Sequence, residues 1–302
     1  MIRTLRIQLT ELCNFNCVYC CHEGTKSDFS ILKNRNLISF IRACHDVLNI
    51  KRVKFTGGEP LEYDENINNI IKEVNREEIK YSIVTNATKY ETFRRLIEEC
   101  PHTEATISLP IPPNLNYINT FQNITGSNLP KIHFNNVIEC INYMLGRNEK
   151  FKINYVLCRG ENTSKEYINE MINFALSNLT INLRFLETAV NSTNNQEGIM
   201  RRYVFNQKDF ENILCELGYE ESVKNKKLDG RSSCIYDIKG IQIKLIKFFC
   251  SYNCEECPED KTSLWLTSTG DMKFCSYKRT SMSVKNWKYS EITKQLDDII
   301  KK

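Results

Sequence analysis

The sequence predicts an α/β fold in which an open barrel of six βα units precedes a small α+β domain. Strand-like and helix-like segments alternate six times between residues 3 and 187, after which short strands and clustered cysteines take over. Strands that alternate with helices form parallel sheets. Six units fall short of the eight of a closed TIM barrel. We therefore expect a partial (β/α)6 barrel over residues 1–215 and a cysteine-rich domain over residues 216–302.

The strands are indicated by alternating or continuous apolar runs at 3–9, 52–56, 81–85, 104–109, 151–157 and 181–186. Apolar residues at helical spacing mark helices between them, at 37–48, 67–74, 91–100, 136–145 and 165–176. Pro101 stops a helix and Pro110 a strand, because proline lacks an amide donor. Beyond residue 187 we expect a polar loop at 191–196, a short helix at 209–217, a charged linker at 222–231 and short strands from residue 235.

The composition indicates an ordinary core and a weak overall charge. Of 302 residues, 41% are hydrophobic and 26% charged, and the formal net charge is +4. This charge is too small and too evenly mixed to predict binding to nucleic acid or to a membrane. We find no signal peptide and no run as long as a membrane span, so we expect a cytoplasmic protein. In that setting, 14 cysteines indicate metal binding rather than disulfides.

Three cysteines on one short loop form the strongest motif. Cys13, Cys17 and Cys20 follow the first strand with the spacing Cys-x3-Cys-x2-Cys, and Cys21 comes directly after them. A [4Fe–4S] cluster normally takes four cysteine ligands, so a three-cysteine loop leaves one iron open to a ligand that is not protein. Zinc is the alternative, although zinc sites usually join two ligands to a second pair further along the chain.

A glycine-rich turn, Gly57-Gly58-Glu59-Pro60, follows the second strand. It lies at the C-terminal end of that strand, where parallel βα folds carry their functional loops. Two glycines allow the backbone to approach a ligand closely, and Glu59 offers a carboxylate to an ammonium group. Taken alone, however, the segment would be interpreted as an ordinary turn.

The cysteine loop, with Tyr19 before its last cysteine, and the Gly57–Pro60 turn together resemble the signature of the radical S-adenosylmethionine (SAM) enzymes. The resemblance implies that the reduced cluster cleaves SAM and that a 5′-deoxyadenosyl radical abstracts hydrogen from the substrate. The cofactor carries the hard step, so we assign no catalytic side chain. An external one-electron reductant, flavodoxin- or ferredoxin-like, is implied as a partner. The residues implied to contact SAM are Tyr19, Gly57, Gly58, Glu59, Asn86 and Ser108.

The strands also predict a cationic inner wall. Residues alternate sides along a strand, and the apolar side must face the outer helices, so the polar side lines the barrel. Burying unpaired cations is costly, so we expect an anionic substrate there, with internal pairing to Glu104 or Glu187 as the alternative. The cations that would converge are Arg6, Arg52, Lys54, Lys152 and Arg184.

Four further cysteines, Cys250, Cys254, Cys257 and Cys275, indicate a second metal site near the C-terminus. Four cysteines around a hairpin are typical of structural zinc. Beside a radical SAM core we favour an auxiliary [4Fe–4S] cluster on Cys254, Cys257 and Cys275. Cys250 is either its fourth ligand or leaves that iron free for substrate.

The layout resembles the GTP 3′,8-cyclase family of molybdenum-cofactor biosynthesis. The resemblance is carried by Phe55–Leu61, Ile124–Gly126, Arg159–Asn162, Arg184–Glu187 and Leu266–Gly270. It implies that a nucleotide-like substrate is cyclised or rearranged, and that Arg6, Lys54, Thr85, Lys152 and Arg184 surround its triphosphate.

The chain departs from that family near its C-terminus. The family carries two arginines after the second auxiliary cysteine, where this chain has Pro258–Lys261 and Ser263–Leu266, and its Gly-Gly tail is replaced by Ile300-Lys-Lys302. One alternative function is a radical SAM enzyme that modifies peptides. Such enzymes commonly carry a leader-binding domain, for which we expect no room before the first strand. A non-enzymatic electron carrier or zinc scaffold is the other, although neither needs Gly57–Pro60 or a cationic wall.

Overall fold

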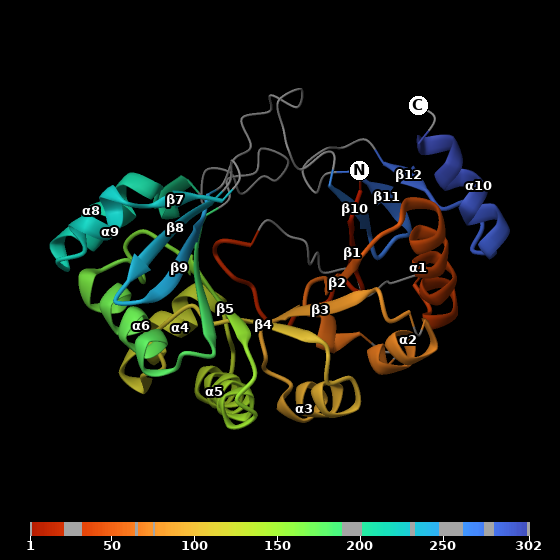
Figure 1. Cartoon of the computed structure of the whole chain (residues 1–302). Coiled ribbons are helices and arrows are strands. Elements are labelled where there is room, and N and C mark those ends of the chain that lie inside the picture. The colour runs from red at the N-terminus through yellow and green to blue at the C-terminus, as the bar shows by residue number, and fades with distance from the viewer. Residues whose placement is uncertain are drawn as a thin grey trace.

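The computed structural model describes residues 2–20, 32–63, 66–74, 76–188, 201–229, 233–247, 262–274 and 281–300. Within them, twelve strands form one sheet in the order β12-β11-β10-β1-β2-β3-β4-β5-β6-β9-β8-β7. The sheet curves into a crescent with helices on its convex side, and its two ends do not meet (Figure 1). The predicted partial barrel is confirmed.

The central six strands are parallel and each is followed by at least one helix. The strands are β1 (Thr4–Gln8), β2 (Arg52–Thr56), β3 (Lys80–Thr85), β4 (Glu104–Ser108), β5 (Phe151–Leu157) and β6 (Ile181–Glu187). The helices of this part are α1 (Asn34–Leu48), α2 (Ile67–Val74), α3 (Tyr90–Glu99), α4 (Ile118–Thr125), α5 (Pro130–Gly146) and α6 (Lys165–Ser177).

The alternation of side chains along each strand explains where the core lies. Leu5 and Ile7 of β1 are fully buried, whereas Arg6 between them is half-buried. On β2, Val53 and Phe55 are likewise buried beneath the helices. Apolar positions are therefore sequestered between sheet and helices, and the polar positions line the concave side.

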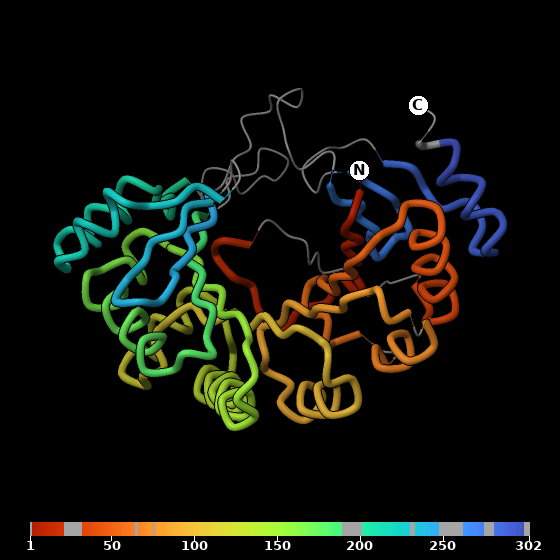
Figure 2. The backbone as a smooth tube through the Cα atoms, in the orientation of Figure 1, coloured from red at the N-terminus to blue at the C-terminus, as the bar shows by residue number. Residues whose placement is uncertain are grey.

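The C-terminal segment continues this sheet at both edges. Strand β9 (Ile241–Ile246) runs parallel to β6 and pairs antiparallel with β8 (Ser233–Ile238). At the other edge β10 (Ser263–Leu266) runs parallel to β1 and pairs antiparallel with β11 (Asp271–Lys273). The hairpins lie on opposite arms of the crescent (Figure 2). The division at residue 215 stays a prediction, since the sheet runs through both parts.

Several elements differ from the sequence prediction. Helix α4 was not expected, and α5 begins at Pro130 rather than Asn136, with proline at the first turn, where its missing N–H costs nothing. The expected charged linker at 222–231 is wrong: α9 (Glu220–Lys224) overlaps its start and β7 (Lys227–Leu228) lies within it. Short elements with polar sequences carry little periodic signal. The loop predicted at 191–196 lies outside the described residues.

The remaining elements cover the two arms. Helix α8 (Gln207–Glu216) confirms the short helix expected at 209–217, with bounds shifted by one or two residues, and begins with a reciprocal capping box between Asn206 and Asp209. Strand β12 (Met282–Ser283) ends the sheet. Helix α10 (Tyr289–Ile300) packs against α1. Short 3-10 turns lie at Pro60–Glu62, Leu115–Tyr117 and Arg201–Tyr203. No helix in the described ranges is long and apolar enough to cross a membrane.

Candidate functional site

The cysteine loop lies at the C-terminal end of β1 and is held by main-chain bonds to the end of α4. The amide of Asn16 donates to the carbonyl of Thr125 at 2.8 Å, and that of Val18 to the carbonyl of Ile124 at 2.9 Å. Gly126 ends α4 in the left-handed conformation, φ +63°, where a side chain would press against Asn16. This contact gives the Ile124–Gly126 motif a structural purpose.

The three thiols of this loop are close enough to influence one another. Cys13 is exposed, and Cys17 and Cys20 are half-buried. Although the Cys13 residue is exposed, desolvation by the surrounding protein raises the pKa of its thiol to about 12, with Glu59 and Cys20 adding to the shift, and burial raises the pKa of Cys17. A positively charged group beside these thiols would favour their thiolate forms.

The donor set fits an iron–sulfur cluster. Among the residues described, no three His, Cys, Asp or Glu side chains are grouped tightly enough to hold a single metal ion. A cubane binds each thiolate to a different iron, so its ligands need not converge on one point. The amide of Phe15 also donates to Cys13 Sγ at 3.4 Å, a bond that favours a thiolate.

The Gly57–Pro60 turn packs directly on the start of the cysteine loop. The amide of Gly58 donates to the carbonyl of Thr10 at 2.8 Å, and that of Glu59 to the carbonyl of Leu12 at 2.7 Å. A Cβ on Gly57 would lie 2.6 Å from the oxygen of Thr10, and one on Gly58 would lie 2.1 Å from that of Leu12. Both glycines are thus required by the approach of the chain to itself, a reason that the sequence did not reveal.

Glu59 is buried and its carboxylate accepts three hydrogen bonds. Oε1 accepts from the hydroxyl of Thr85 at 2.5 Å and from the amide of Leu61 at 3.0 Å, and Oε2 accepts from the amide of Asn86 at 2.6 Å. Burial raises the pKa of Glu59 to about 7, although these bonds oppose the shift. A cationic ligand beside Glu59 would favour its charged form.

Asn86 and Thr85 connect this carboxylate to the cysteine loop. The side-chain amide of Asn86 donates to Asn14 at 2.8 Å and lies 3.9 Å from Cys13 Sγ. Thr85 is buried and in register with Ile107, on the side of the sheet that faces the helices. Its bond to Glu59 gives it a positioning role, whereas the resemblance implied contact with the triphosphate.

Tyr19 and Ser108 lie on either side of the same rim. Tyr19 packs against the core, and burial, with Cys17 nearby, raises the pKa of its hydroxyl well above the usual range. Ser108 is half-buried at the end of β4, in register with Asn154. Asn154 Oδ1 is buried without a hydrogen-bond partner in the described part of the chain.

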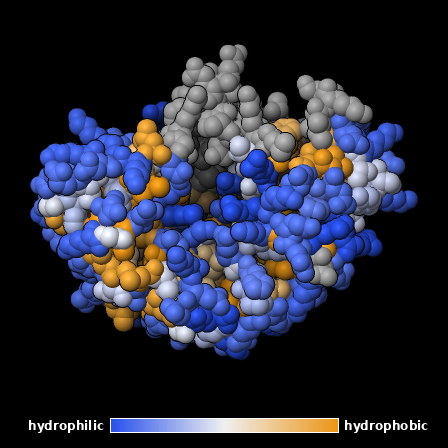
Figure 3. Space-filling view, viewed as in Figure 1, coloured by the Kyte–Doolittle hydropathy of each residue, from blue (hydrophilic) through white to orange (hydrophobic). Residues whose placement is uncertain are grey.

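The predicted cations all belong to the concave side, but they differ in their partners. Arg6 and Lys54 are in register on adjacent strands. Lys152 forms an ion pair with Glu104, so the alternative of internal pairing holds for this residue. Arg52 is exposed at the start of β2. In Figure 3, hydrophilic side chains border the hollow between the arms of the crescent.

Arg184 is a predicted cation whose guanidinium is partly removed from solvent. It is half-buried, and no ion pair of Arg184 is found among the described residues. Burial lowers the pKa of its guanidinium, which Arg52 reinforces and Glu104 opposes. Because the Arg184 guanidinium is desolvated and has no ion pair in the described part of the chain, an anionic ligand would stabilise its charge.

Sequence reasoning missed three neighbours of these groups. Asn14 bonds both Asn86 and Thr88. Lys244 is in register with Arg184 and paired with Asp229. Trp265 is in register with Arg6. Alternation within 241–246 and 263–266 puts Lys244 and Trp265 on the polar side, but nothing local shows which strands lie beside them.

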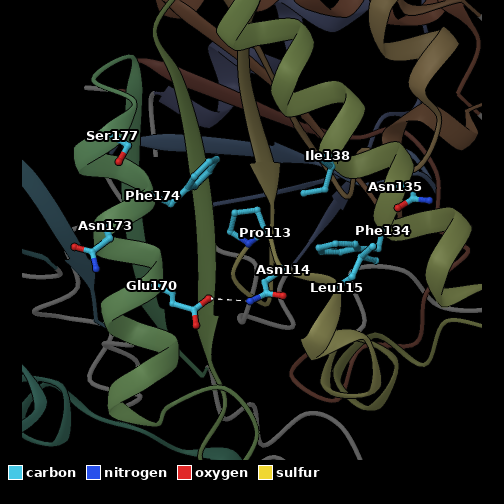
Figure 4. A pocket seen from close by; sticks show the side chains of 10 residues that line it. All are labelled: Pro113, Asn114, Leu115, Phe134, Asn135, Ile138, Glu170, Asn173, Phe174 and Ser177. Atoms are coloured by element: carbon cyan, nitrogen blue, oxygen red, sulfur yellow. Dashed lines mark hydrogen bonds between the residues drawn. The ribbon is translucent and has the colours of Figure 1, made fainter.

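A groove of about 610 Å³ on the convex side, between α5 and α6, lies apart from this rim (Figure 4). Its walls include Phe134, Ile138 and Phe174, and its one charged side chain, Glu170, is already bonded to Tyr117 and Asn114. It therefore lacks the cations expected at the site. The second cysteine group (Cys250, Cys254, Cys257 and Cys275) and Cys21 lie outside the described residues.

A cysteine loop at the rim of an open parallel barrel, supported by a Gly-Gly-Glu turn whose Glu59 is buried, defines a class of enzyme. The pattern of the radical SAM superfamily matches residues 7–175, more than half of the chain. The chain belongs to this superfamily and is an enzyme. Its members bind SAM with a [4Fe–4S] cluster.

Curated relatives and solved structures show which radical SAM enzymes the chain is similar to. The chain is 26% identical to a probable GTP 3′,8-cyclase of Pyrobaculum aerophilum, over 94% of this chain and 86% of that protein. It is 29% identical to GTP 3′,8-cyclase of Clostridium perfringens, over 99% and 88%. The fold is similar to Streptococcus suis SuiB bound to SAM, with TM-score 0.67 and 17% identity, over 94% of this chain and 63% of that one. The AdoMet-bound anSMEcpe also matches, with TM-score 0.61 and 16% identity, over 96% and 79%.

Proposed function

We propose that this enzyme uses SAM to abstract hydrogen from a phosphorylated, nucleotide-like substrate and thereby drives a cyclisation or rearrangement of the GTP 3′,8-cyclase type. The observation that carries the proposal is the concave wall of the sheet, where Arg6, Lys54 and Arg184 lie midway along strands β1, β2 and β6. The curated relatives, which align over nearly the whole chain, support the same substrate class.

In this proposal, Cys13, Cys17 and Cys20 hold the first cluster, and Glu59 receives the SAM ammonium group. The cluster with SAM supplies one-electron, hydrogen-abstracting chemistry when bound. The protein positions the reactants: Asn86 and Thr85 fix Glu59, while Arg6, Lys54, Lys152 and Arg184 orient the phosphates. An auxiliary [4Fe–4S] cluster on Cys254, Cys257 and Cys275, with Cys250 as its fourth ligand or with that iron left free for substrate, belongs to the proposal. So does an external one-electron reductant.

Anaerobically reconstituted holoenzyme with a chemical reductant tests the proposal. We expect 5′-deoxyadenosine from SAM, and its yield should rise when GTP is added, together with a new product that retains the phosphates. A solved structure of SuiB contains a precursor peptide, so a peptide is the informative competitor. If nucleotide phosphates neither bind nor alter SAM cleavage while an uncharged peptide is modified, the nucleotide proposal fails.

A further inference from the structure

Trp265 is the aromatic residue of the concave wall that touches a predicted substrate cation. It lies on β10, directly opposite Arg6 on β1, and Arg6 is in turn opposite Lys54 on β2. Residues in register on parallel strands project to the same side of the sheet. Leu264 and Leu266, which flank Trp265, are buried on the helix side. The indole therefore belongs to the same row of side chains as Arg6 and Lys54.

The guanidinium of Arg6 is stacked on this indole rather than paired with a carboxylate. Its central carbon lies 4.9 Å from the ring centroid, a cation–π distance. The Nε of Arg6 is buried and has no hydrogen-bond partner in the described part of the chain. No described carboxylate forms an ion pair with Arg6, in contrast to Lys152 with Glu104 and Lys244 with Asp229.

The two kinds of partner have different consequences for an anionic ligand. A carboxylate neutralises the cation and occupies its N–H donors, so a ligand must displace it. An aromatic face attracts the guanidinium through its quadrupole and leaves the N–H edge available. The stack also gives Arg6 a partner on the side away from Lys54, and like charges directly opposite on neighbouring strands repel.

We infer that Trp265 is a substrate-positioning residue, whose indole holds the Arg6 guanidinium flat against the inner wall with its N–H edge free for a phosphate of the substrate. The inference rests on the proposed function and adds a residue from the C-terminal segment to it. Trp265 acts through Arg6 and need not touch the ligand. Because β10 pairs with β1 at this side of the barrel, a residue of the C-terminal segment would thereby fix the orientation of Arg6.

The test is a double-mutant cycle on anaerobically reconstituted holoenzyme, with binding of GTP and of inorganic tripolyphosphate measured by equilibrium dialysis. Trp265→Leu should weaken both ligands about tenfold, whereas Trp265→Tyr, which keeps an aromatic face, should stay within about threefold. In an Arg6→Ala background, Trp265→Leu should add less than about twofold, because the indole has lost the group that it positions.

Trp287 provides the matched control, since the chain has two tryptophans and Trp287 packs on Phe40, away from Arg6. Trp287→Leu should leave the affinity for both ligands unchanged. Iron content and circular dichroism of each variant show that it is folded, and Trp265→Tyr serves if Trp265→Leu is not.

The outcomes separate the inference from the proposed function. If Arg184→Ala loses GTP binding but Trp265→Leu does not, the proposed function stands and the inference fails. An equal loss from Trp265→Leu with and without Arg6 also overturns it, because Trp265 would then act independently of Arg6. If tripolyphosphate binds with the expected coupling but GTP does not, the inference holds and the nucleotide is wrong. If the wild-type enzyme binds neither, both are wrong.

Discussion

The amide of Glu59 donates to the carbonyl of Leu12 at 2.7 Å, and this bond ties the Gly57–Pro60 turn to the start of the cysteine loop. The two motifs are separated by some 40 residues of chain, yet they form one packed unit at the ends of neighbouring strands. The carboxylate of the same residue bonds the turn after β3 through Thr85 and Asn86. A single residue thus joins the loops of three adjacent strands.

The first prediction concerns the space at this junction. Gly58→Ala should destabilise the protein by roughly 3 kcal/mol, because its Cβ would lie 2.1 Å from a backbone oxygen that cannot move aside easily. The displaced loop should also reduce SAM binding and the iron bound by the N-terminal site. Chemical denaturation and iron analysis measure the two effects.

Gly146→Ala is the control for that substitution. Nothing lies within 4 Å of a Cβ added at Gly146, which ends α5, so the variant should be neutral or slightly more stable. Wild-type stability and SAM affinity in Gly58→Ala would show that the loop does not depend on this contact.

The second prediction is a pH dependence from Glu59, whose pKa is raised by burial to about 7 in the folded protein. In the proposed site the SAM ammonium group pairs with this carboxylate, so SAM affinity should rise from pH 6 to pH 8. Well below pH 7 the limiting slope is about tenfold in affinity for each pH unit. Equilibrium dialysis of the holoenzyme across this range measures it. Glu59→Gln should bind SAM weakly with little pH dependence; the same rise in that variant would exclude Glu59 as its source.

The same shift has a consequence for stability without SAM. The folded pKa lies above the ordinary value of 4.5, so the folded state holds an extra proton between these values. Stability from this group is fully present below pH 4.5 and is lost as the pH rises through 7, by on the order of 3 kcal/mol. Urea unfolding at pH 5 and pH 8 should show a smaller difference for Glu59→Gln than for the wild type.

The third prediction separates the two proposed clusters. Replacing Cys13, Cys17 and Cys20 together by Ala should abolish 5′-deoxyadenosine formation and leave about four irons per chain, the content of one cubane. Cys21→Ala is the control and should retain both the activity and all of the iron. Stoichiometric zinc with no residual iron in the triple variant would instead identify a structural zinc site.

Local patterns were enough to predict the barrel. Apolar and polar residues alternate along the strands, as in Leu5, Arg6 and Ile7, and apolar residues recur at helical spacing in the outer helices. The edges of the sheet were beyond such reasoning. Pairing β6 with β9 or β1 with β10 joins segments far apart in the chain, and no local period shows which strands become neighbours. The extra helix α4 is only eight residues long, so its apolar pattern is short, yet it holds the cysteine loop.

At the site, residue types were predictable, but most of their partners were not. Alternation predicted that Lys152 and Arg184 face inward, and Glu104 was a candidate partner, but which cation pairs with Glu104 depends on the register between neighbouring strands. Thr85 followed from the resemblance, whereas its bond to Glu59 follows from the turn after β3. Side-chain pairing is set by tertiary packing, and this is why Lys152 has an ion pair with Glu104 whereas Arg184 has none among the described residues.

The difference between the paired Lys152 and Arg184, which has no ion pair among the described residues, gives the last prediction. Arg184→Ala removes a desolvated guanidinium that has no ion pair among the described residues, so it should cost little stability while weakening GTP binding by about ten- to a hundredfold, or roughly 1.5–3 kcal/mol. Lys152→Ala should behave differently. It leaves the half-buried Glu104 without its partner, which should destabilise the fold and also place an unpaired negative charge beside the phosphates. Lys152→Ala combined with Glu104→Gln should recover much of that stability, because neither charge then remains.

Thermal unfolding and nucleotide binding of the three variants measure both effects. Equal losses of affinity and stability in Arg184→Ala and Lys152→Ala, with no recovery in the double variant, would show that the Glu104 pair does not distinguish the two cations.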